Sequence, residues 1–179
     1  MNHEIFLRDK KCDKRDHVFM EMAYCIAQLS KDLQTHIGAI IVGKSHEVVS
    51  AGYNSFPRGI NDDDMTRQTR PRKYLFFIHA EVNAIDNAAR IGVSTQNCRL
   101  YTNAMPCCNC AMGIINAGIT EVIIDQDFNE RFLQLGGAEW LDSHTASREM
   151  FNEAKVSVTQ LTDFKTKLPR LLRGDLLRY

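Results

Sequence analysis

Two short segments decide how this chain folds: HAEVNAI at residues 79–85 and PCCNC at residues 106–110. Apolar residues recur at helical spacing after each segment, which predicts that each one opens a helix. The first helix is expected over residues 78–91, because a glycine that can stop a helix follows it. The second is expected over residues 107–117, because a proline, favoured at helix starts, precedes it. Two successive helices therefore carry the polar residues of these segments.

Short apolar runs rich in β-branched residues predict the strands around these helices. The expected strands cover residues 37–42, 48–53, 99–102, 121–124 and 156–161. Further helices are expected over residues 16–30 and 144–154, and a basic terminal helix over 163–179. Residues 128–143 are ambiguous because two adjacent glycines interrupt any helix there. This order predicts an α/β fold in three layers, an α-β-α sandwich around a central mixed five-stranded sheet.

Composition bounds the domain organisation and the compartment. The chain has 179 residues, 44% hydrophobic and 25% charged, which fits a single domain over residues 1–179 with enough length for a core. Residues 1–16 lack the apolar centre of a signal peptide, and no apolar run approaches the roughly 18 residues that span a bilayer. We therefore expect a cytoplasmic protein without a membrane partner.

The charge balance bears on the kind of partner. Lys and Arg together number 22, as do Asp and Glu. No global field draws the chain to nucleic acid, although a local basic patch would escape this count. A small-molecule substrate is therefore favoured, with no nucleic-acid partner.

Cysteine usage points to a metal. Six cysteines are present, and three of them crowd into residues 107–110, which suits a metal better than disulfides. On a helix, the i, i+3 spacing of Cys107 and Cys110 puts both sulfurs on one face. With His79 they make three zinc ligands, and a fourth position left open for water is typical of a catalytic zinc site.

Glu81 supplies a proton carrier beside this metal set. It lies two residues from His79, so it is not expected to share a ligand face, but it can lean over the open position. A carboxylate there can take a proton from water and pass it to a departing nitrogen. These parts fit hydrolytic deamination, in which water attacks an amidine-like carbon and ammonia leaves.

Two alternatives from other classes stay open at this point. A structural zinc would need a fourth ligand, for which Cys108 and Cys98 are the candidates; Cys108 points away from the ligand face, which favours a packing role. A zinc-stabilised nucleotide sensor without turnover is the other alternative. Glu81 argues against it, because a structural site has no use for an acid beside its metal.

The combination of H-x-E with P-C-x-x-C is the general signature of zinc-dependent nucleobase deaminases. More of the chain resembles one family in particular, the deoxycytidylate (dCMP) deaminases. The segments that carry this resemblance are AGYN at 51–54, FPRG at 56–59, HAEVNAI at 79–85, the P-C-x-x-C motif at 106–110 and GITEV at 118–122. The resemblance covers roughly residues 20–125.

This resemblance implies the cytidine-deaminase fold, with zinc on His79, Cys107 and Cys110 and with Glu81 as the proton shuttle. It implies conversion of dCMP to dUMP, the precursor for thymidylate synthesis. Members are typically homo-oligomers, often hexamers, that dCTP activates and dTTP inhibits. We expect the same here, with one zinc ion per subunit.

The resemblance also implies a nucleotide, either substrate or effector, near Gly52, Asn54, Arg58, Gly59, Asn61 and Ala80. Chemically, glycines let backbone N–H groups approach a phosphate, Arg58 can bind one bidentately, and Asn54 offers both a donor and an acceptor. The acidic run 62–64 could hold Mg²⁺ carried by a nucleoside triphosphate, but a solvated turn is the favoured interpretation. Four nearby cations either contact phosphate or balance that run: Arg67, Arg70, Arg72 and Lys73.

Substrate choice stays open between dCMP, dCTP and both. Asn103 and Met105 depart from the residues common at these positions in the family, and both are expected to border the base pocket. Adenosine deamination in transfer RNA is a less favoured alternative, because it uses the same metal chemistry but wants a basic surface.

Overall fold

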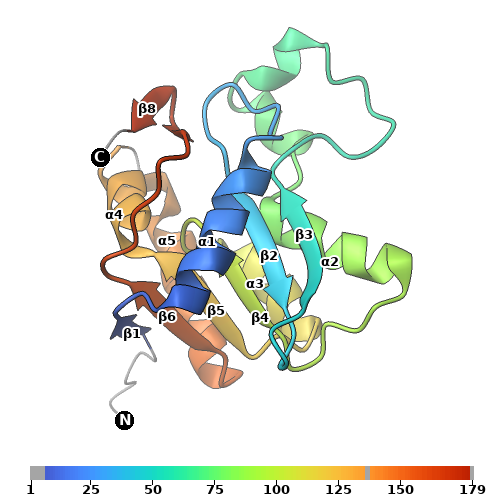
Figure 1. Ribbon diagram of the computed structural model, residues 1–179. Helices are drawn as coiled ribbons and strands as arrows, with labels where there is room; N and C mark the ends of the chain where they lie inside the picture. The colour runs from blue at the N-terminus through green and yellow to red at the C-terminus, as the bar shows by residue number, and fades with distance from the viewer. Residues whose placement is uncertain (1–6, 136–137, 178–179) are drawn as a thin grey trace.

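The computed structural model describes residues 7–135 and 138–177, and a mixed six-stranded sheet forms its centre (Figure 1). The strands are β1 (Leu7–Lys10), β2 (Gly38–Val42), β3 (Val48–Tyr53), β4 (Arg99–Thr102), β5 (Glu121–Asp125) and β6 (Ser157–Leu161). They lie in the order β1-β6-β5-β4-β2-β3. β1, β6, β5 and β4 are parallel, whereas β2 is antiparallel to β4 and to β3.

The α/β sandwich expected from the sequence is confirmed, with six strands in the sheet instead of five. The additional strand is β1, which pairs with β6 at the edge in the register Leu7 to Val158. Its sequence, LRDK, carries three charged residues, and those three are exposed. A charged edge strand has no apolar alternation, so periodicity does not reveal it.

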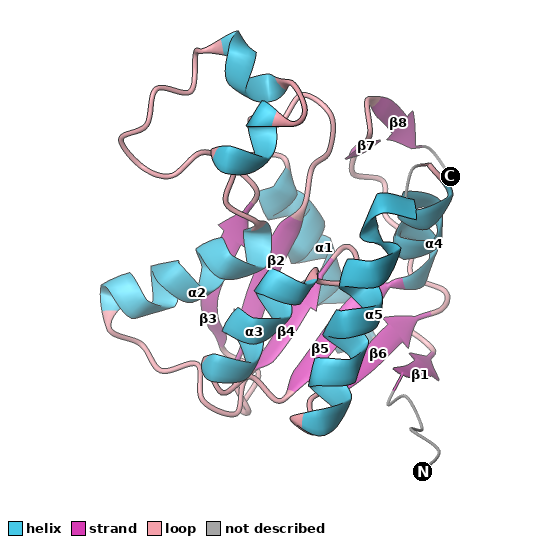
Figure 2. Cartoon of the chain, turned by 180° about the vertical axis from the view of Figure 1, so that it is seen from behind, coloured by secondary structure: helices cyan, strands magenta, loops and turns pink. Residues whose placement is uncertain are grey.

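Helices cover both faces of the sheet (Figure 2). α1 (Lys14–Ala27) lies on one face, and α2 (Ala80–Ile91), α3 (Cys108–Asn116) and α5 (Ala138–Glu153) lie on the other. α4 (Gln126–Gln134) follows β5 directly. The ambiguous stretch 128–143 therefore divides between α4 and α5, while its residues 136 and 137 lie outside the described residues.

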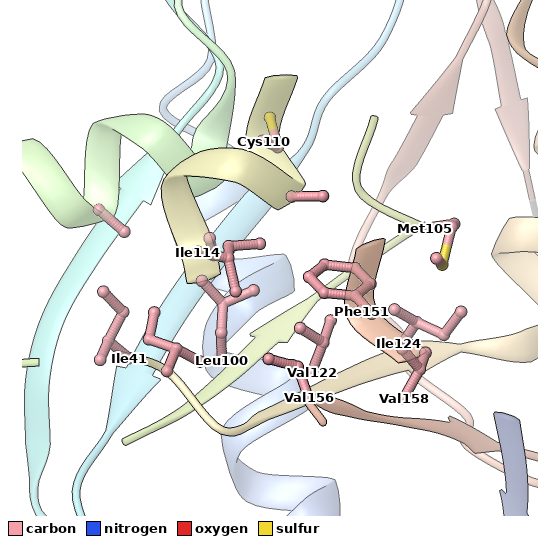
Figure 3. Close-up of a cluster of buried hydrophobic side chains, with 14 of the residues drawn as sticks. Ile41, Leu100, Met105, Cys110, Ile114, Val122, Ile124, Phe151, Val156 and Val158 are labelled. Atoms are coloured by element: carbon pink, nitrogen blue, oxygen red, sulfur yellow. The ribbon is translucent and has the colours of Figure 1, made fainter. Parts of the chain in front are cut away.

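Each face of the sheet has its own hydrophobic core. Leu100, Val122 and Phe151 are buried between the sheet and the helices of the α2–α3–α5 face, and Cys110 lies at the edge of this cluster (Figure 3). Met20 belongs to the second core, on the α1 face. Because the central strands are covered on both faces, they consist of nearly continuous apolar runs.

The predicted terminal helix over 163–179 is wrong. The chain instead forms a two-stranded hairpin of β7 (Arg170–Leu172) and β8 (Asp175–Leu177), and residues 178 and 179 lie outside the described residues. Phe164 and Leu172 are buried in the α1-face core. Packing against that core selects the extended conformation, which overrides the basic, helix-like composition of the segment.

A long connection leads from β3 to α2 and contains two short 3₁₀ turns, η1 (Met65–Gln68) and η2 (Arg72–Leu75). Figure 1 shows it projecting beyond the end of the sheet where β3 ends. β3, β4 and β5 all run antiparallel to β2, so the carboxyl ends of β4 and β5 lie at the same edge of the sheet as that of β3. Crevices at the carboxyl ends of strands are the usual ligand sites of α/β folds. Within the described ranges, no helix has both the length and the apolar character to cross a bilayer.

Candidate metal and active site

The three proposed metal ligands lie at the starts of two helices that face each other. α2 begins at Ala80 and α3 at Cys108, so His79 and Cys107 are the N-cap residues, one position before each helix. Their backbones are extended, and their carbonyls accept the first helical hydrogen bonds, each at 2.9 Å. Neither side chain caps its own helix, so both remain available to a metal.

The ligand atoms converge to distances that fit zinc. His79 Nδ1 lies 3.4 Å from Cys107 Sγ and 3.4 Å from Cys110 Sγ, and the two sulfurs are 3.5 Å apart. A tetrahedral zinc ion with ordinary bond lengths holds such atoms about 3.5–3.8 Å from one another. The donor set, two thiols and one imidazole, is also a common zinc set.

In the described part of the chain, the cluster of potential metal ligands has three members. Cys108, one candidate for a fourth ligand, is half-buried, and its backbone N–H donates to Ser143 Oγ at 3.0 Å. Cys98, the other candidate, lies in the core beside the carbonyl of Gln96. Neither belongs to the cluster, which argues against a closed structural site.

The site's own electrostatics favour a thiolate. The pKa of the Cys107 thiol is lowered to about 4, because its sulfur shares a hydrogen bond with Cys110 and lies beside His79. The pKa of Cys110 is raised well above its usual value by the same hydrogen bond and by burial. One proton is thus shared asymmetrically between the two sulfurs, which suits a pair that binds a cation on deprotonation.

Glu81 lies in the first turn of α2 and is only 5% exposed. Its Oε2 is 3.5 Å from Cys110 Sγ, so the carboxyl group lies against the metal ligands. Burial raises its pKa above the usual value. A carboxyl group with a raised pKa is suited to accept a proton and release it again.

These residues open into a cavity that is large enough for a small ligand group and that continues to the surface. The lining of this cavity comes from parts that lie far apart in the sequence. Four of its side chains belong to α4, α5 and the β3–α2 connection, and the sequence motifs did not identify them: Tyr74, Phe132, Trp140 and His144. Trp140 lies 6.1 Å from the His79 ring, measured between centroids. These four residues lie on different elements and share no sequence motif, so sequence spacing did not point to them.

His144 is the titratable member of this wall. It is 3% exposed, and its Nδ1 makes no hydrogen bond within the described residues. Burial lowers its pKa to about 4, so the imidazole is neutral near pH 7. An unpartnered, buried ring nitrogen is a site where a ligand can supply the missing hydrogen bond.

The residues expected near a nucleotide divide between several places. Asn54 and Ala80 line the cavity with Glu81. The Asn54 amide is fully engaged with the protein, accepting from Ile37 N–H at 2.9 Å and donating to Thr35 O at 2.7 Å. Asn54 therefore shapes the cavity wall and already uses its hydrogen-bonding groups internally.

The remaining four residues lie outside that cavity. Gly52 lies under α2, where an added Cβ would be 2.3 Å from the Ala84 nitrogen. Arg58 lines a separate hollow and donates to Asn87 Oδ1. Gly59, with a φ of +80°, and Asn61 are both exposed.

The two residues that depart from the family pattern, Asn103 and Met105, lie in different surroundings. Met105 lines the cavity, with its backbone N–H donating to Asn129 Oδ1 at 3.0 Å. Asn103 is fully buried and accepts from Gly38 N–H at 2.6 Å, so it ties β2 to the end of β4. Of the two, Met105 is the residue that contributes to the cavity surface.

Comparison with known proteins identifies the family. The model of the cytidine and deoxycytidylate deaminase zinc-binding region matches residues 13–126 of this chain. The chain belongs to this family. A deaminase from Aliivibrio fischeri, encoded in the luxG 3′ region, is 38% identical over 80% of this chain and 90% of its own length. The human deoxycytidylate deaminase is 36% identical, over 84% of this chain and 85% of its own length.

A solved structure supports the fold assignment. The dCMP deaminase of cyanophage S-TIM5, crystallised with dCMP and dUMP, superposes with a TM-score of 0.64 at 23% identity. The match covers 85% of this chain and all of that one. Within the family, zinc is the metal that the cluster of His79, Cys107 and Cys110 fits.

Proposed function

We propose that this protein is a zinc-dependent hydrolase that converts dCMP and water to dUMP and ammonia. The observation that carries the proposal is a buried carboxyl group, Glu81, against a three-ligand metal set with no fourth protein ligand among the described residues. The similarity to deoxycytidylate deaminases over most of the chain supports the choice of substrate.

The chain's own residues divide the work of the reaction. Zinc, when bound by His79, Cys107 and Cys110, supplies a Lewis acid that makes water a better nucleophile. Glu81 accepts the proton that water loses as its oxygen bonds to C4 of the base. It then donates this proton to the amino nitrogen, the C4–N bond breaks, and ammonia leaves. Burial raises the pKa of Glu81, which makes its carboxylate a stronger base and favours the first half of this transfer.

The cavity wall supports the same reaction by orienting the base. The Tyr74 and Phe132 rings contact Trp140 edge-on, with centroids 6.0 Å apart in each pair. These rings present an apolar surface beside His79 that excludes bulk water and suits a planar heterocycle. Met105 adds a flexible apolar contact to this surface.

The decisive experiment follows deamination by ultraviolet absorbance with dCMP, dCTP, CMP and deoxycytidine side by side. We expect the highest kcat/KM with dCMP. A higher kcat/KM with dCTP than with dCMP would show that dCTP, the alternative substrate, is the preferred one. Turnover of adenosine in a transfer-RNA substrate, with none of the cytosine compounds used, would overturn it.

Regulation, assembly and metal content belong to the same proposal. We expect activation by dCTP, with Mg²⁺ carried by the triphosphate, inhibition by dTTP, a homo-hexamer and one zinc ion per subunit in a cytoplasmic enzyme. Adding each effector to the dCMP assay tests the regulation. Light scattering and elemental analysis of the purified protein test the assembly and the zinc content.

A further inference from the structure

The cavity that contains Glu81 has two unlike sides. The loop before β2 and the connection after β3 supply three charged residues to its lining: Asp32, Arg70 and Lys73. α4 and α5, which lie between β5 and β6 in the chain, supply rings that carry no charge near pH 7: Phe132, Trp140 and His144. Because β4 lies between β5 and β2 in the sheet, the two sets approach the cavity from opposite sides.

Glu81 determines which edge of a cytosine base faces each side. Attack of water at C4 moves an electron pair onto the neighbouring ring nitrogen, N3, so the acid has to lie beside the edge that carries N3. α2, which bears Glu81, packs closely on β3 at Gly52. The opposite edge of the ring, which carries C5, therefore points away from α2 and toward the rings of α4 and α5.

His144 is a polar group on this second side. It is buried and packs against two rings, with the Phe132 centroid 5.9 Å and the Trp140 centroid 6.3 Å from its own. Neither of its ring nitrogens forms a hydrogen bond in the described part of the chain. Protein atoms enclose Nδ1 but not Nε2, so Nε2 is the nitrogen that a ligand in the cavity can reach.

A purely structural role would not need an imidazole at this position. Leucine or phenylalanine would fill the space without an unpaired polar group, and an unpaired buried polar group lowers stability. Trp140 lies one turn before His144 on α5, and its Nε1–H also lacks an acceptor among the described residues. Two unpartnered rings on one face of a helix, in the wall of a cavity, favour a ligand contact over packing alone.

The chemistry of a neutral imidazole indicates the kind of group that it binds. Nε2 donates or accepts a hydrogen bond, depending on which ring nitrogen carries the proton. A hydroxyl group suits both cases, because it is a donor and an acceptor, whereas the C–H group at C5 of cytosine is neither. Met105, which also lines the cavity, has a flexible side chain that can make room for a small substituent at C5.

We propose that this protein also deaminates deoxycytidylates that carry a hydroxymethyl group at C5, and that His144 binds the hydroxyl of this group. The inference rests on the proposed function, because it assumes that the base lies at Glu81. The balance of the reaction is unchanged: the oxygen of water bonds to C4, the C4–N bond breaks, ammonia leaves, and the substituent at C5 stays intact. His144 is thus a residue that determines substrate specificity.

The test compares two substrates that differ by one oxygen atom, 5-hydroxymethyl-dCMP and 5-methyl-dCMP. General damage to the fold or to the metal site changes kcat/KM for both, so their ratio isolates the hydroxyl group. The variants are His144→Leu, which removes both ring nitrogens, and His144→Gln, whose amide can replace Nε2 as a hydrogen-bonding group. His36→Leu is the matched control, because His36 is half-buried, its Nδ1 also lacks a partner among the described residues, and it does not line the cavity.

In the parent protein we expect kcat/KM to be about 10- to 100-fold higher with the hydroxymethyl than with the methyl compound, the range for one buried hydrogen bond. His144→Leu should abolish this preference, His144→Gln should retain part of it, and His36→Leu should retain all of it. Equal kcat/KM values for the two compounds in the parent protein, or a preference that survives His144→Leu, would overturn the inference. Turnover of dCMP without turnover of either 5-substituted compound would do the same, because the wall would then exclude any group at C5.

Binding provides a readout that does not depend on turnover. Trp140 is the single tryptophan and lines the cavity, so its fluorescence can report titrations with the two products, 5-hydroxymethyl-dUMP and its 5-methyl counterpart. We expect the hydroxymethyl product to bind more tightly to the parent protein, and the two products to bind equally to His144→Leu. If the parent protein deaminates no cytosine compound, the proposed function fails, while this titration still decides whether His144 binds the hydroxyl. Equal dissociation constants in the parent protein would contradict the inference.

Discussion

Glu81 shows how one residue acquires a chemical role from its surroundings. An exposed glutamate is ionised near pH 7 and holds no proton to donate. Here burial raises the pKa, while the positive charge of His79 acts in the opposite direction. Burial is the larger effect, so the pKa of this carboxyl group lies above that of an exposed glutamate.

The Glu81→Gln substitution isolates this proton transfer. We expect zinc content and folding to be retained and kcat for dCMP to fall by about 10²–10⁴-fold, because the amide has the same shape but cannot carry the proton. Absorbance kinetics measure the rate, and elemental analysis measures the zinc.

Cys107→Ala is the informative contrast, because it removes a metal ligand and should lose zinc and activity together. Cys108→Ala, at the neighbouring half-buried position outside the cluster, controls for the loss of a thiol. Substantial turnover in Glu81→Gln would contradict the role given to this carboxylate.

At the scale of elements, the close packing of α2 on β3 determines where His79 and Glu81 lie. Gly52 is the point of closest approach, because a Cβ there would lie 2.5 Å from the Ala80 carbonyl oxygen and 2.3 Å from the Ala84 nitrogen. Only a glycine leaves room for the helix backbone at this distance. The G-Y-N motif therefore has a packing function for its glycine, whatever its neighbours bind.

Gly52→Ala should push α2 away from the sheet. We expect a loss of about 1–3 kcal/mol in the free energy of unfolding, as for overpacked cores, together with a lower kcat because the first turn of α2 moves. Urea denaturation and the dCMP assay measure the two effects.

Gly113→Ala provides the control, since a Cβ there meets only the Ile85 Cδ1 atom, at 3.8 Å. That substitution lies within α3 and should be neutral or stabilising by about 0.5–1 kcal/mol. Equal losses in the two variants would contradict the close-approach argument.

At the scale of the whole molecule, a buried polar network joins three distant segments. Asp125, at the end of β5, accepts from the Tyr24 hydroxyl of α1 at 2.6 Å and lies 3.7 Å from Arg170 of β7. Arg170 also pairs with Asp127 at 3.0 Å. These contacts connect the C-terminal hairpin to the sheet and to α1.

The network predicts a pH dependence of stability. Burial raises the pKa of Asp125 to about 6, above the roughly 3.9 of an unfolded aspartate. The contribution of protonated Asp125 to the free energy of unfolding is therefore fully present below about pH 4. It is lost as pH rises through about 6, an effect of at most about 3 kcal/mol. Asp125→Asn should lack this trend, because the amide does not titrate but can still cap α4.

Urea unfolding of both proteins between pH 4 and 7 measures the difference in their stabilities. We expect the parent protein to lose stability relative to the variant as pH rises through this range. A constant difference would show that Asp125 does not titrate there. Other titrating groups are common to the two proteins and cancel in the comparison.

Much of the fold followed from local pattern. The five apolar strands and the helices over residues 14–27, 80–91 and 108–116 were predicted within a few positions, because periodicity is a property of neighbouring residues. The charged edge strand and the C-terminal hairpin were not. Each of them depends on pairing or packing with residues far away in the sequence, and so has no clear local signal.

The sequence by itself determined the chemistry that this chain can offer: an imidazole, two thiols at helical spacing and a carboxylate, each near the start of a helix. Only the tertiary structure decided that residue 79 meets residues 107 and 110, and that Trp140, Lys73 and the C-terminal hairpin surround the same cavity. The physical reason is that ligand spacing within one helix turn is set by local backbone geometry. Separate segments meet because apolar residues from the whole chain are buried together in the two hydrophobic cores.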